Sequence, residues 1–394
     1  MDIVASFNRL KDYCEREDFR GWDPYDGLNS TVFRRLPWLP DRRLPRLAWI
    51  QMMKRTPFNL RKVMGVKKAY NPKGLGLFLA GYCNLYKREP SALYLDKIKY
   101  LADKLISLQS TGYSGSCWGY NFDWQARAFF QPRNTPTVVA TTYIANALMD
   151  AWEITKEQQY LTVALGSAGF VLYDLNRSYD DKGNFAFSYS PQDHTQVFNA
   201  SLLGTRLLAR IYHYTRDVSL LKPARQSAAF CCDHRQENGA WSYGTLPFHQ
   251  WTDNFHTGYN LECLAAYQYY THDHSFRKAI EKGTDYYLRT FFTEEGKPKY
   301  YNNKLYPLDV HNTAQLIITL SRLGLFGQHR PLMDKVLGWT INNMQDREGY
   351  FYYQLRRGLN VRTPYMRWAQ AWMFNAMSLY LLEIKSDHDQ NSYL

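Results

Sequence analysis

The chain has 394 residues, of which 45% are hydrophobic and 21% charged, and its 48 Lys and Arg against 36 Asp and Glu give a formal net charge of +12. This composition is typical of a globular protein and excludes a disordered chain. No apolar run approaches the roughly 20 residues of a membrane-spanning helix, and the opening MDIVASFNRL lacks the basic and then apolar order of a secretory signal. The sequence therefore predicts a cytoplasmic protein, with a peripheral position at the inner face of the membrane as the alternative.

The first 60 residues are predicted to form a basic, proline-broken arm that packs on the rest of the chain. Pro37, Pro40 and Pro45 interrupt this stretch between Arg34 and Arg46. Residues 61–385 are predicted to form one helical domain, and residues 386–394 a tail. Within the helical domain, the segments 91–109 and 313–323 place apolar residues at the i, i+3, i+4 and i+7 positions of a helix.

Short aromatic stretches separate the helical segments and recur along the chain. They lie at 117–122, 183–189, 239–244, 297–301 and 349–353. Polar residues before the following helices keep a spacing of about 58 residues, which suits two helices and two loops. These residues are Thr135, His194, His256, His311 and Arg367, with Asn71 as a weaker sixth.

Six helical hairpins bury their apolar faces either in an open solenoid or in a closed ring. Because the polar residue changes its identity from repeat to repeat, we favour the ring, in which many loops build one site. The predicted fold is all-α, an (α/α)6 toroid with short aromatic-rich loops or β-hairpins at one end.

The densest polar and aromatic stretch is 241–262, where His256, Tyr259 and Glu262 are spaced by three and share one helical face. Asp253 precedes that helix, where a carboxylate also caps it. A second cluster, 118–125, joins two Trp and a Tyr to polar side chains and is typical of a surface that stacks on sugar rings. The predicted catalytic residues are Asp253, His256, Tyr259, Glu262 and His311. The predicted substrate-binding residues are Trp118, Tyr120, Asp123, Trp124, His194, Tyr243, Trp251, Asn254, Asp309 and Arg367.

Three kinds of chemistry remain open at such a site. Proton abstraction next to a carboxylate, as in an epimerase or a lyase, needs a base, an acid and a cation for the carboxylate, and the His- and Tyr-rich set favours it, with Arg367 as the cation. Glycoside hydrolysis needs two carboxyl groups, for which Asp253 with Asp123 or Asp309 is the candidate pair. A glycan-binding component without catalysis is the third alternative.

No metal or other cofactor is predicted. The six cysteines are irregularly spaced and form no CxxC motif, and no HExxH or complete GxGxxG motif occurs. The charge of +12 is compatible with nucleic acid, but no nucleic-acid-binding motif accompanies it. We therefore expect a carbohydrate partner, of anionic character, and a contact with membrane-bound polysaccharide machinery is compatible with the same charge. The sequence predicts no oligomeric state.

Two segments, Cys117–Gln125 (CWGYNFDWQ) and Asp253–Glu262 (DNFHTGYNLE), resemble the six-hairpin glycosidase-like superfamily. Within this superfamily, the sequence is most similar to the toroid proteins of bacterial surface-polysaccharide gene sets. The resemblance covers most of the chain after residue 60 and implies an (α/α)6 toroid with a role in polysaccharide metabolism. N-acylglucosamine 2-epimerases carry a similar Gly-His-x-x-Glu phrase, in which Gly258 and Glu262 match and Tyr259 stands where the histidine is. Glucuronyl C5-epimerases use catalytic tyrosines, a role that the resemblance implies for Tyr259 or Tyr243.

Overall fold

Six long helices with buried surfaces on every side form the inner wall of a ring. The computed structural model describes residues 2–127 and 129–391. The inner helices are α4 (Pro72–Arg88), α6 (Val138–Thr155), α8 (Phe198–Thr215), α10 (Asn254–Thr271), α12 (Val310–Arg322) and α14 (Trp372–Asn391). Each contacts the next, and α14 contacts α4, so the inner wall closes on itself. The predicted closed toroid is confirmed, and the open solenoid is excluded.

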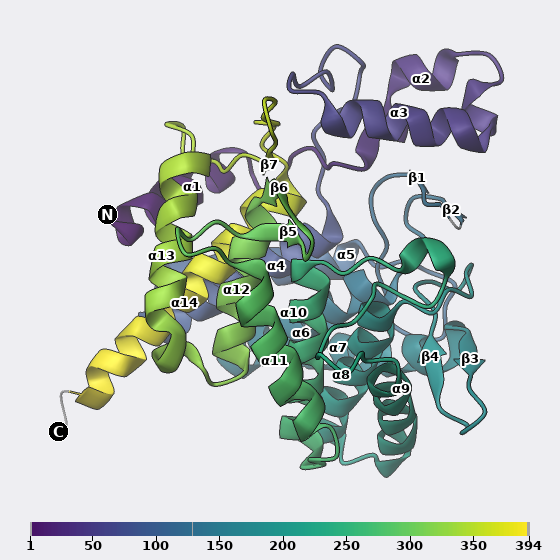
Figure 1. The fold of residues 1–394 in the computed structure, drawn as a ribbon, viewed down its shortest axis with the longest axis vertical. Coiled ribbons are helices and arrows are strands. Elements are labelled where there is room, and N and C mark those ends of the chain that lie inside the picture. Colours follow the sequence, from purple (N-terminus) through teal and green to yellow (C-terminus); the bar gives the residue numbers. More distant parts are fainter. Residues whose placement is uncertain (1, 128, 392–394) are drawn as a thin grey trace.

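The outer wall consists of helices with one apolar face. They are α5 (Ala92–Ser107), α7 (Gln158–Gly169), α9 (Leu221–Asp233), α11 (Arg277–Phe291), α13 (Phe326–Met344) and α1 (Ile3–Arg16). In α5, for example, the buried residues Ile98, Leu101, Ala102 and Leu105 form a single stripe. The sixth outer helix is α1, which packs on α14 from the other end of the chain (Figure 1). Residues 3–16 are thus part of the ring wall, whereas the predicted boundaries at residues 60 and 385 stay a prediction.

The inner helices begin at equivalent positions of successive repeats. Their first residues are preceded by the N-caps Asn71, Thr137, Val197, Asp253 and Asp309, and Tyr365 precedes the π-helical turn Met366–Ala371 that leads into α14. From Val197 onward these positions are 56 residues apart. The side chains of Asn71, Thr137, Asp253 and Asp309 accept hydrogen bonds from backbone N–H groups of the first turn, which satisfies otherwise unpaired donors.

Short strands lie in the loops that precede the inner helices. They pair as β1 (Trp124–Gln125) with β2 (Phe130–Gln131), β3 (Arg177–Tyr179) with β4 (Phe185–Phe187), and β5 (Lys299–Tyr301) with β6 (Lys304–Asp309), which also pairs with β7 (Gln354–Leu355). All pairs are antiparallel. These hairpins and the inner-helix N-termini form the loop end of the ring.

A helical pair lies over the loop end. It comprises α2 (Thr31–Arg35) and α3 (Arg43–Arg55), which Figure 1 shows beside β1 and β2, away from the ring helices. Short 3-10 turns at Asp26–Asn29 and Leu39–Asp41 flank α2. The pair has a small core of its own, made by Leu28, Phe33 and Ile50.

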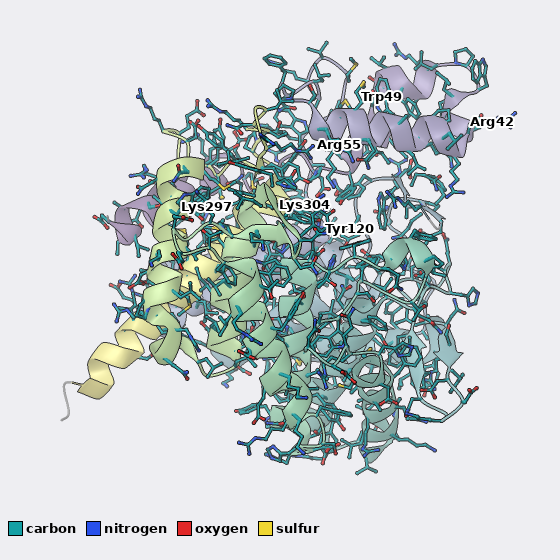
Figure 2. All side chains as sticks on the ribbon, viewed as in Figure 1. Arg42, Trp49, Arg55, Tyr120, Lys297 and Lys304 are labelled. Atoms are coloured by element: carbon teal, nitrogen blue, oxygen red, sulfur yellow. The ribbon has the colours of Figure 1, made fainter. Side chains whose placement is uncertain are left out.

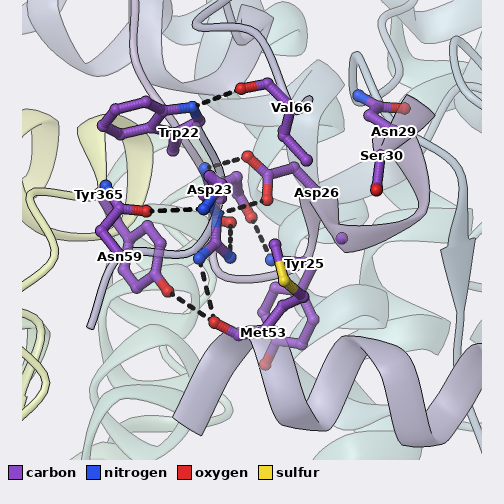
Figure 3. Close-up of polar contacts among 12 residues, drawn as sticks. Trp22, Asp23, Tyr25, Asp26, Asn29, Ser30, Met53, Asn59, Val66 and Tyr365 are labelled. Atoms are coloured by element: carbon purple, nitrogen blue, oxygen red, sulfur yellow. Dashed lines mark hydrogen bonds and ion pairs between the residues drawn. The ribbon is translucent and has the colours of Figure 1, made fainter. Parts of the chain in front are cut away.

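The carboxylates of Asp23 and Asp26 hold the N-terminal segment in place, and Figure 3 shows the hydrogen bonds around Asp26. Asp26 accepts a hydrogen bond from Arg61 Nε at 2.7 Å, and the same guanidinium donates to the backbone oxygens of Met53 and Asp23. The Asp23 carboxylate accepts two hydrogen bonds from Arg367, at 2.6 and 2.8 Å. Since Arg367 lies at the start of the last inner helix, the N-terminal segment and the C-terminal hairpin are directly coupled.

Close approach of the inner helices α10 and α12 depends on Gly258. A Cβ atom there would lie 2.6 Å from Gln315 Cγ and 2.7 Å from Thr319 Oγ1. We expect Gly258→Ala to lower the free energy of unfolding by about 1–3 kcal/mol through overpacking. Gly327, in the exposed first turn of α13, has open space around it, so Gly327→Ala is the matched control and should be neutral or stabilising by up to about 1 kcal/mol. Urea unfolding of the two variants measures the difference, and equal stabilities would contradict the close contact.

Candidate functional site

A buried carboxylate and a partly exposed imidazole form a pair at the start of α10. Asp253 uses Oδ1 to accept the backbone N–H of His256 at 2.9 Å and places Oδ2 2.8 Å from His256 Nδ1. The Asp253 side chain is fully buried, while that of His256 is 19% exposed. A buried carboxylate next to Nδ1 favours the tautomer with its proton on Nδ1, which leaves Nε2 as the basic nitrogen. No hydrogen bond from the described part of the chain reaches Nε2.

Aromatic faces surround the His256 imidazole. Tyr243, Phe255 and Trp251 have ring centroids 4.7, 4.2 and 5.7 Å from it. Tyr243 and Trp251 are themselves stacked, 4.5 Å apart and within 12° of parallel, and both are partly exposed. An exposed stacked pair beside a basic nitrogen is suited to the apolar face of a sugar ring. The structure therefore brings together the predicted residues Asp253, His256, Tyr243 and Trp251.

A second imidazole lies below Phe255. His311 Nε2 is 2.7 Å from the Tyr259 hydroxyl, and its ring stacks on Phe255 at 4.6 Å and on Trp372 at 4.3 Å. Burial, together with the positive charge of Lys73, holds the pKa of His311 well below its usual range, so the ring is neutral. Its Nδ1 is buried without a hydrogen-bond partner in the described chain. Phe255 thus separates two imidazoles, one partly exposed and one buried.

The carboxylates of Asp309 and Glu262 are buried in the ring wall. Asp309 accepts hydrogen bonds from Gln354 Nε2, Trp368 Nε1 and the backbone N–H of His311, and burial raises its pKa to about 6. Glu262 lies deeper, with Oε1 3.3 Å from both Tyr143 Oη and Arg206. Burial raises its pKa despite Arg206. These contacts indicate that both carboxylates hold neighbouring side chains in place.

The Lys73 amine lies at the floor of the ring, and among the described residues no carboxylate forms an ion pair with it. The Lys73 Nζ is 4.6 Å from the ring centroid of Tyr143, 5.1 Å from that of Trp372 and 5.6 Å from that of Tyr259. Lys73 is 3% exposed, and burial lowers its pKa well below the usual lysine value. No sequence signal pointed to this residue beyond its position two residues after the Asn71 cap.

Two further residues reach the loop end from the N-terminal segment and were missed in the sequence. The Lys54 Nζ of α3 lies 2.7 Å from the Tyr25 hydroxyl, 4.2 Å from the Tyr25 ring centroid and 5.8 Å from that of Trp368. Trp368 in turn packs edge-on against Phe255 and His311. Burial lowers the pKa of Lys54 to about 7, against the opposing effect of Asp309. Local sequence has no signal for this placement, because it depends on where the helical pair docks.

The lowered pKa of Lys54 predicts a pH dependence of stability. Because the unfolded chain holds the Lys54 proton up to about pH 10 whereas the folded chain releases it near pH 7, stability should rise with pH between these values and fall as pH drops toward 7. In Lys54→Met this contribution disappears. Urea unfolding at several pH values from 7 to 10 checks the prediction, with Lys278→Met, an exposed lysine of α11, as the control. An unchanged slope in Lys54→Met would contradict it.

Several predicted binding residues have structural contacts instead. Arg367 is only 4% exposed and donates both of its bonds to Asp23, so it is not free to clamp a substrate carboxylate. Trp118 is fully buried, with Nε1 donating to the backbone oxygen of Leu105, and is no stacking platform. Asn254 is also buried and accepts the hydrogen bond of Tyr287 Oη. Each of these three side chains is held by contacts within the protein, which sequence spacing does not reveal, so this conformation does not offer them to a substrate.

The remaining predicted binding residues range from buried to exposed. Trp124 is partly exposed and packs on Tyr25 and Tyr189, whereas Tyr120 is 6% exposed and pairs its hydroxyl with that of Tyr189 at 3.0 Å. Asp123 is ion-paired with Arg34 at 3.2 Å. His194 is exposed on the loop before α8, and among the described residues no ring contact or hydrogen bond joins it to the imidazole pair.

The six cysteines are free thiols, five of them buried. In the described ranges, no three or more His, Cys, Asp or Glu side chains are grouped as a metal ion would require. The same residues include no helix that is long and apolar enough to cross a membrane.

Comparison with solved structures relates this ring to proteins that act on carbohydrates. A cellobiose 2-epimerase from Bacillus thermoamylovorans B4167 superposes with a TM-score of 0.63 at 11% identity, covering 80% of this chain and 88% of the epimerase. The protein has the six-hairpin (α/α)6 toroid fold. An unsaturated glucuronyl hydrolase specific for heparin matches over 98% of this chain and 96% of the hydrolase, with a TM-score of 0.63 and 12% identity. A GH76 α-mannanase from Bacteroides thetaiotaomicron gives 0.64 at 11% identity, covering 82% and 90%. No family model and no curated protein matches the sequence.

Proposed function

We propose that this toroid is a carbohydrate-active enzyme whose chemistry is acid–base proton transfer, of the epimerase or lyase type, on an acidic or amino-sugar glycan of bacterial surface-polysaccharide metabolism. The observation that carries the proposal is the Asp253–His256 pair, with a basic Nε2 beside the stacked rings of Tyr243 and Trp251. The similarity to sugar epimerases, a polysaccharide lyase and glycoside hydrolases supports a carbohydrate substrate.

In the proposed mechanism, a sugar ring stacks on Tyr243 and Trp251 and presents a C–H bond to His256 Nε2. Nε2 takes the proton while the Asp253 carboxylate stabilises the imidazolium through Nδ1. The Tyr259–His311 pair beneath Phe255 is the proposed second proton carrier, since the Tyr259 and His256 ring centroids are 5.8 Å apart. Delivery of another proton from the Tyr259 hydroxyl to the opposite face of the carbon inverts it, and proton exchange with solvent then resets both groups. Loss of a neighbouring oxygen substituent from the same carbanion gives elimination instead.

An anionic substrate needs a cation, and Lys54 takes the role that the sequence suggested for Arg367. Its ammonium faces Tyr25 and Trp368 and has no carboxylate partner in the described chain. With a pKa of about 7, the amine is protonated in part at neutral pH, and a bound carboxylate would favour its charged form.

Deuterium incorporation tests this function whatever the identity of the product. The protein is incubated in D2O with uronate- and amino-sugar-containing oligosaccharides, and NMR follows loss of C–H signals, while ultraviolet absorbance follows unsaturated products. His256→Ala should lower the rate by about 10²–10⁴-fold. His274→Ala, which removes an exposed imidazole after the other end of α10, should leave it unchanged.

The alternatives give different outcomes in the same experiment. Release of reducing ends without deuterium incorporation would point to glycoside hydrolysis, for which Asp253, Asp123 and Asp309 would have to leave their present hydrogen bonds. Saturable glycan binding without any turnover would point to a binding component. Full activity of His256→Ala would refute the proposed base.

A further inference from the structure

The positive charge of the protein is concentrated in one short segment over the loop end. Residues 31–68, called here the basic segment, contain eleven Lys and Arg against one acidic residue, Asp41, and so hold ten of the chain's twelve net positive charges. Five of these cations form no hydrogen bond or ion pair with any described residue, and all five are exposed. They are Arg35, Arg42, Arg55, Lys62 and Lys67.

Exposed apolar side chains are interleaved with these cations. Within the described residues, sixteen large hydrophobic side chains are exposed, and six of them fall in the basic segment, which is about a tenth of the chain. They are Val32, Trp38, Leu44, Met52, Phe58 and Val63, of which Phe58 is 75% and Val63 77% exposed. Such a concentration marks an interaction surface.

The helix α3 presents two different faces. Its buried residues are Ile50, which belongs to the small core of the helical pair, and Met53. Leu44, Ala48 and Met52 are spaced by four residues, so they form a stripe along the exposed side. Figure 2 shows Arg42 and Arg55 at the two ends of the same helix. An exposed apolar stripe flanked by unpaired cations is the pattern of a helix that lies in a membrane interface.

We propose that the basic segment docks the protein on an anionic lipid surface. Acidic headgroups complement the unpaired Arg and Lys side chains, and Trp38, Leu44 and Phe58 enter the boundary between headgroups and acyl chains. A soluble polyanion such as a nucleic acid or a free acidic glycan would match the charge but would leave these apolar side chains in water. The surface belongs to the segment that also carries Lys54, so the loop end of the ring would face the bilayer region.

Vesicle sedimentation with the full chain tests the proposal. We expect binding to vesicles of phosphatidylcholine with phosphatidylglycerol, little binding to phosphatidylcholine alone, and weakening by salt. The triple variant Arg35→Gln/Arg42→Gln/Lys62→Gln should bind these vesicles about a hundredfold more weakly. The matched control Lys222→Gln/Lys278→Gln/Lys282→Gln removes the same charge from exposed lysines of α9 and α11 and should bind as the parent does.

A second pair of variants tests the apolar contribution. Trp38→Ser/Phe58→Ser should lose anionic vesicle binding, while Tyr173→Ser/Val218→Ser, with similar exposure elsewhere, should retain it. Circular dichroism verifies that all variants are folded. Equal loss in both charge variants would overturn the proposal, and so would binding of the unchanged protein to heparin without any binding to anionic vesicles. The surface would be assigned to self-association instead if the unchanged protein did not bind vesicles and light scattering showed that it is a dimer, whereas Trp38→Ser/Phe58→Ser is a monomer.

Discussion

Asp253→Asn is expected to leave the helix cap intact and to abolish most of the proton-transfer activity. In the wild-type protein the two carboxylate oxygens face two N–H donors, the backbone N–H and Nδ1–H of His256. An asparagine that keeps its oxygen on the backbone N–H turns its NH2 toward Nδ1, which then has to be the acceptor. The proton moves to Nε2, and the base disappears at the position that faces the substrate. We expect the rate to fall by about 10²–10⁴-fold.

Nitrogen NMR of the imidazole measures this tautomer change independently of activity. The Nε2 resonance of His256 should change from unprotonated to protonated in Asp253→Asn, while the free energy of unfolding stays close to that of the wild type, because the cap remains. Asp253→Ser is the matched comparison, since serine also caps a helix but does not reach Nδ1. An Asp253→Asn protein with wild-type activity and an altered tautomer would show that Nε2 is not the base.

Arg61→Ala is expected to have the largest effect on stability. The Arg61 side chain has no exposed surface, and its removal takes the charged donor away from the Asp26 carboxylate and from the Asp23 and Met53 carbonyl oxygens. These acceptors keep only the backbone N–H of Asp23, the backbone N–H of Asp26 and the Tyr365 hydroxyl, respectively. Breaking a buried ion pair from one side costs about 3–5 kcal/mol. Burial already raises the pKa of Asp26 to about 6 with Arg61 present, so the carboxyl group will take up a proton more readily without it.

The loss should be confined to the helical pair that Arg61 fastens. Limited proteolysis and hydrogen exchange should show residues 31–66 opening while the ring helices stay protected. Arg61→Met/Asp26→Leu removes both charges together and should recover part of the lost stability, because no unpaired charge stays buried. Exposed Arg35 provides the control, since Arg35→Ala should change stability by less than about 0.5 kcal/mol. Equal stability of Arg61→Ala and the wild type would contradict the role of the ion pair.

The ring was predictable because its signals are local and repeated. Capping residues such as Asp253 and Asp309 stand one period apart at the start of inner helices. Each is recognised from its own residue type and from the helical pattern of the few residues that follow it. The contact between Tyr259 and His311, 52 residues apart, follows once the period is known. The ion pair of Arg367 has no such local signal, because its partner Asp23 lies 344 residues away and has no place in the repeat.

Lys54 and Tyr25 were missed for a related reason. The basic, proline-broken stretch contains no local pattern that predicts the contact of Lys54 with Tyr25 and Trp368. This contact depends on the long-range ion pairs Asp26–Arg61 and Asp23–Arg367. The roles of His256, Tyr259, Glu262 and the other candidates in catalysis stay predictions that the variants above address.

The packing of α1 on α14 has a consequence for synthesis of the chain. The ribosome releases the first helix with its apolar residues Phe7, Leu10 and Cys14, but the helix that covers them follows all the other ring helices in the chain, and Phe7 meets Phe374 only after it has emerged. Five hairpins can assemble in order during translation, whereas closure of the ring waits until α14 is available. Until α14 is in place, the apolar surfaces of α1 and α4 that it covers are exposed to solvent in the nascent protein. Chaperones would be most needed at these surfaces.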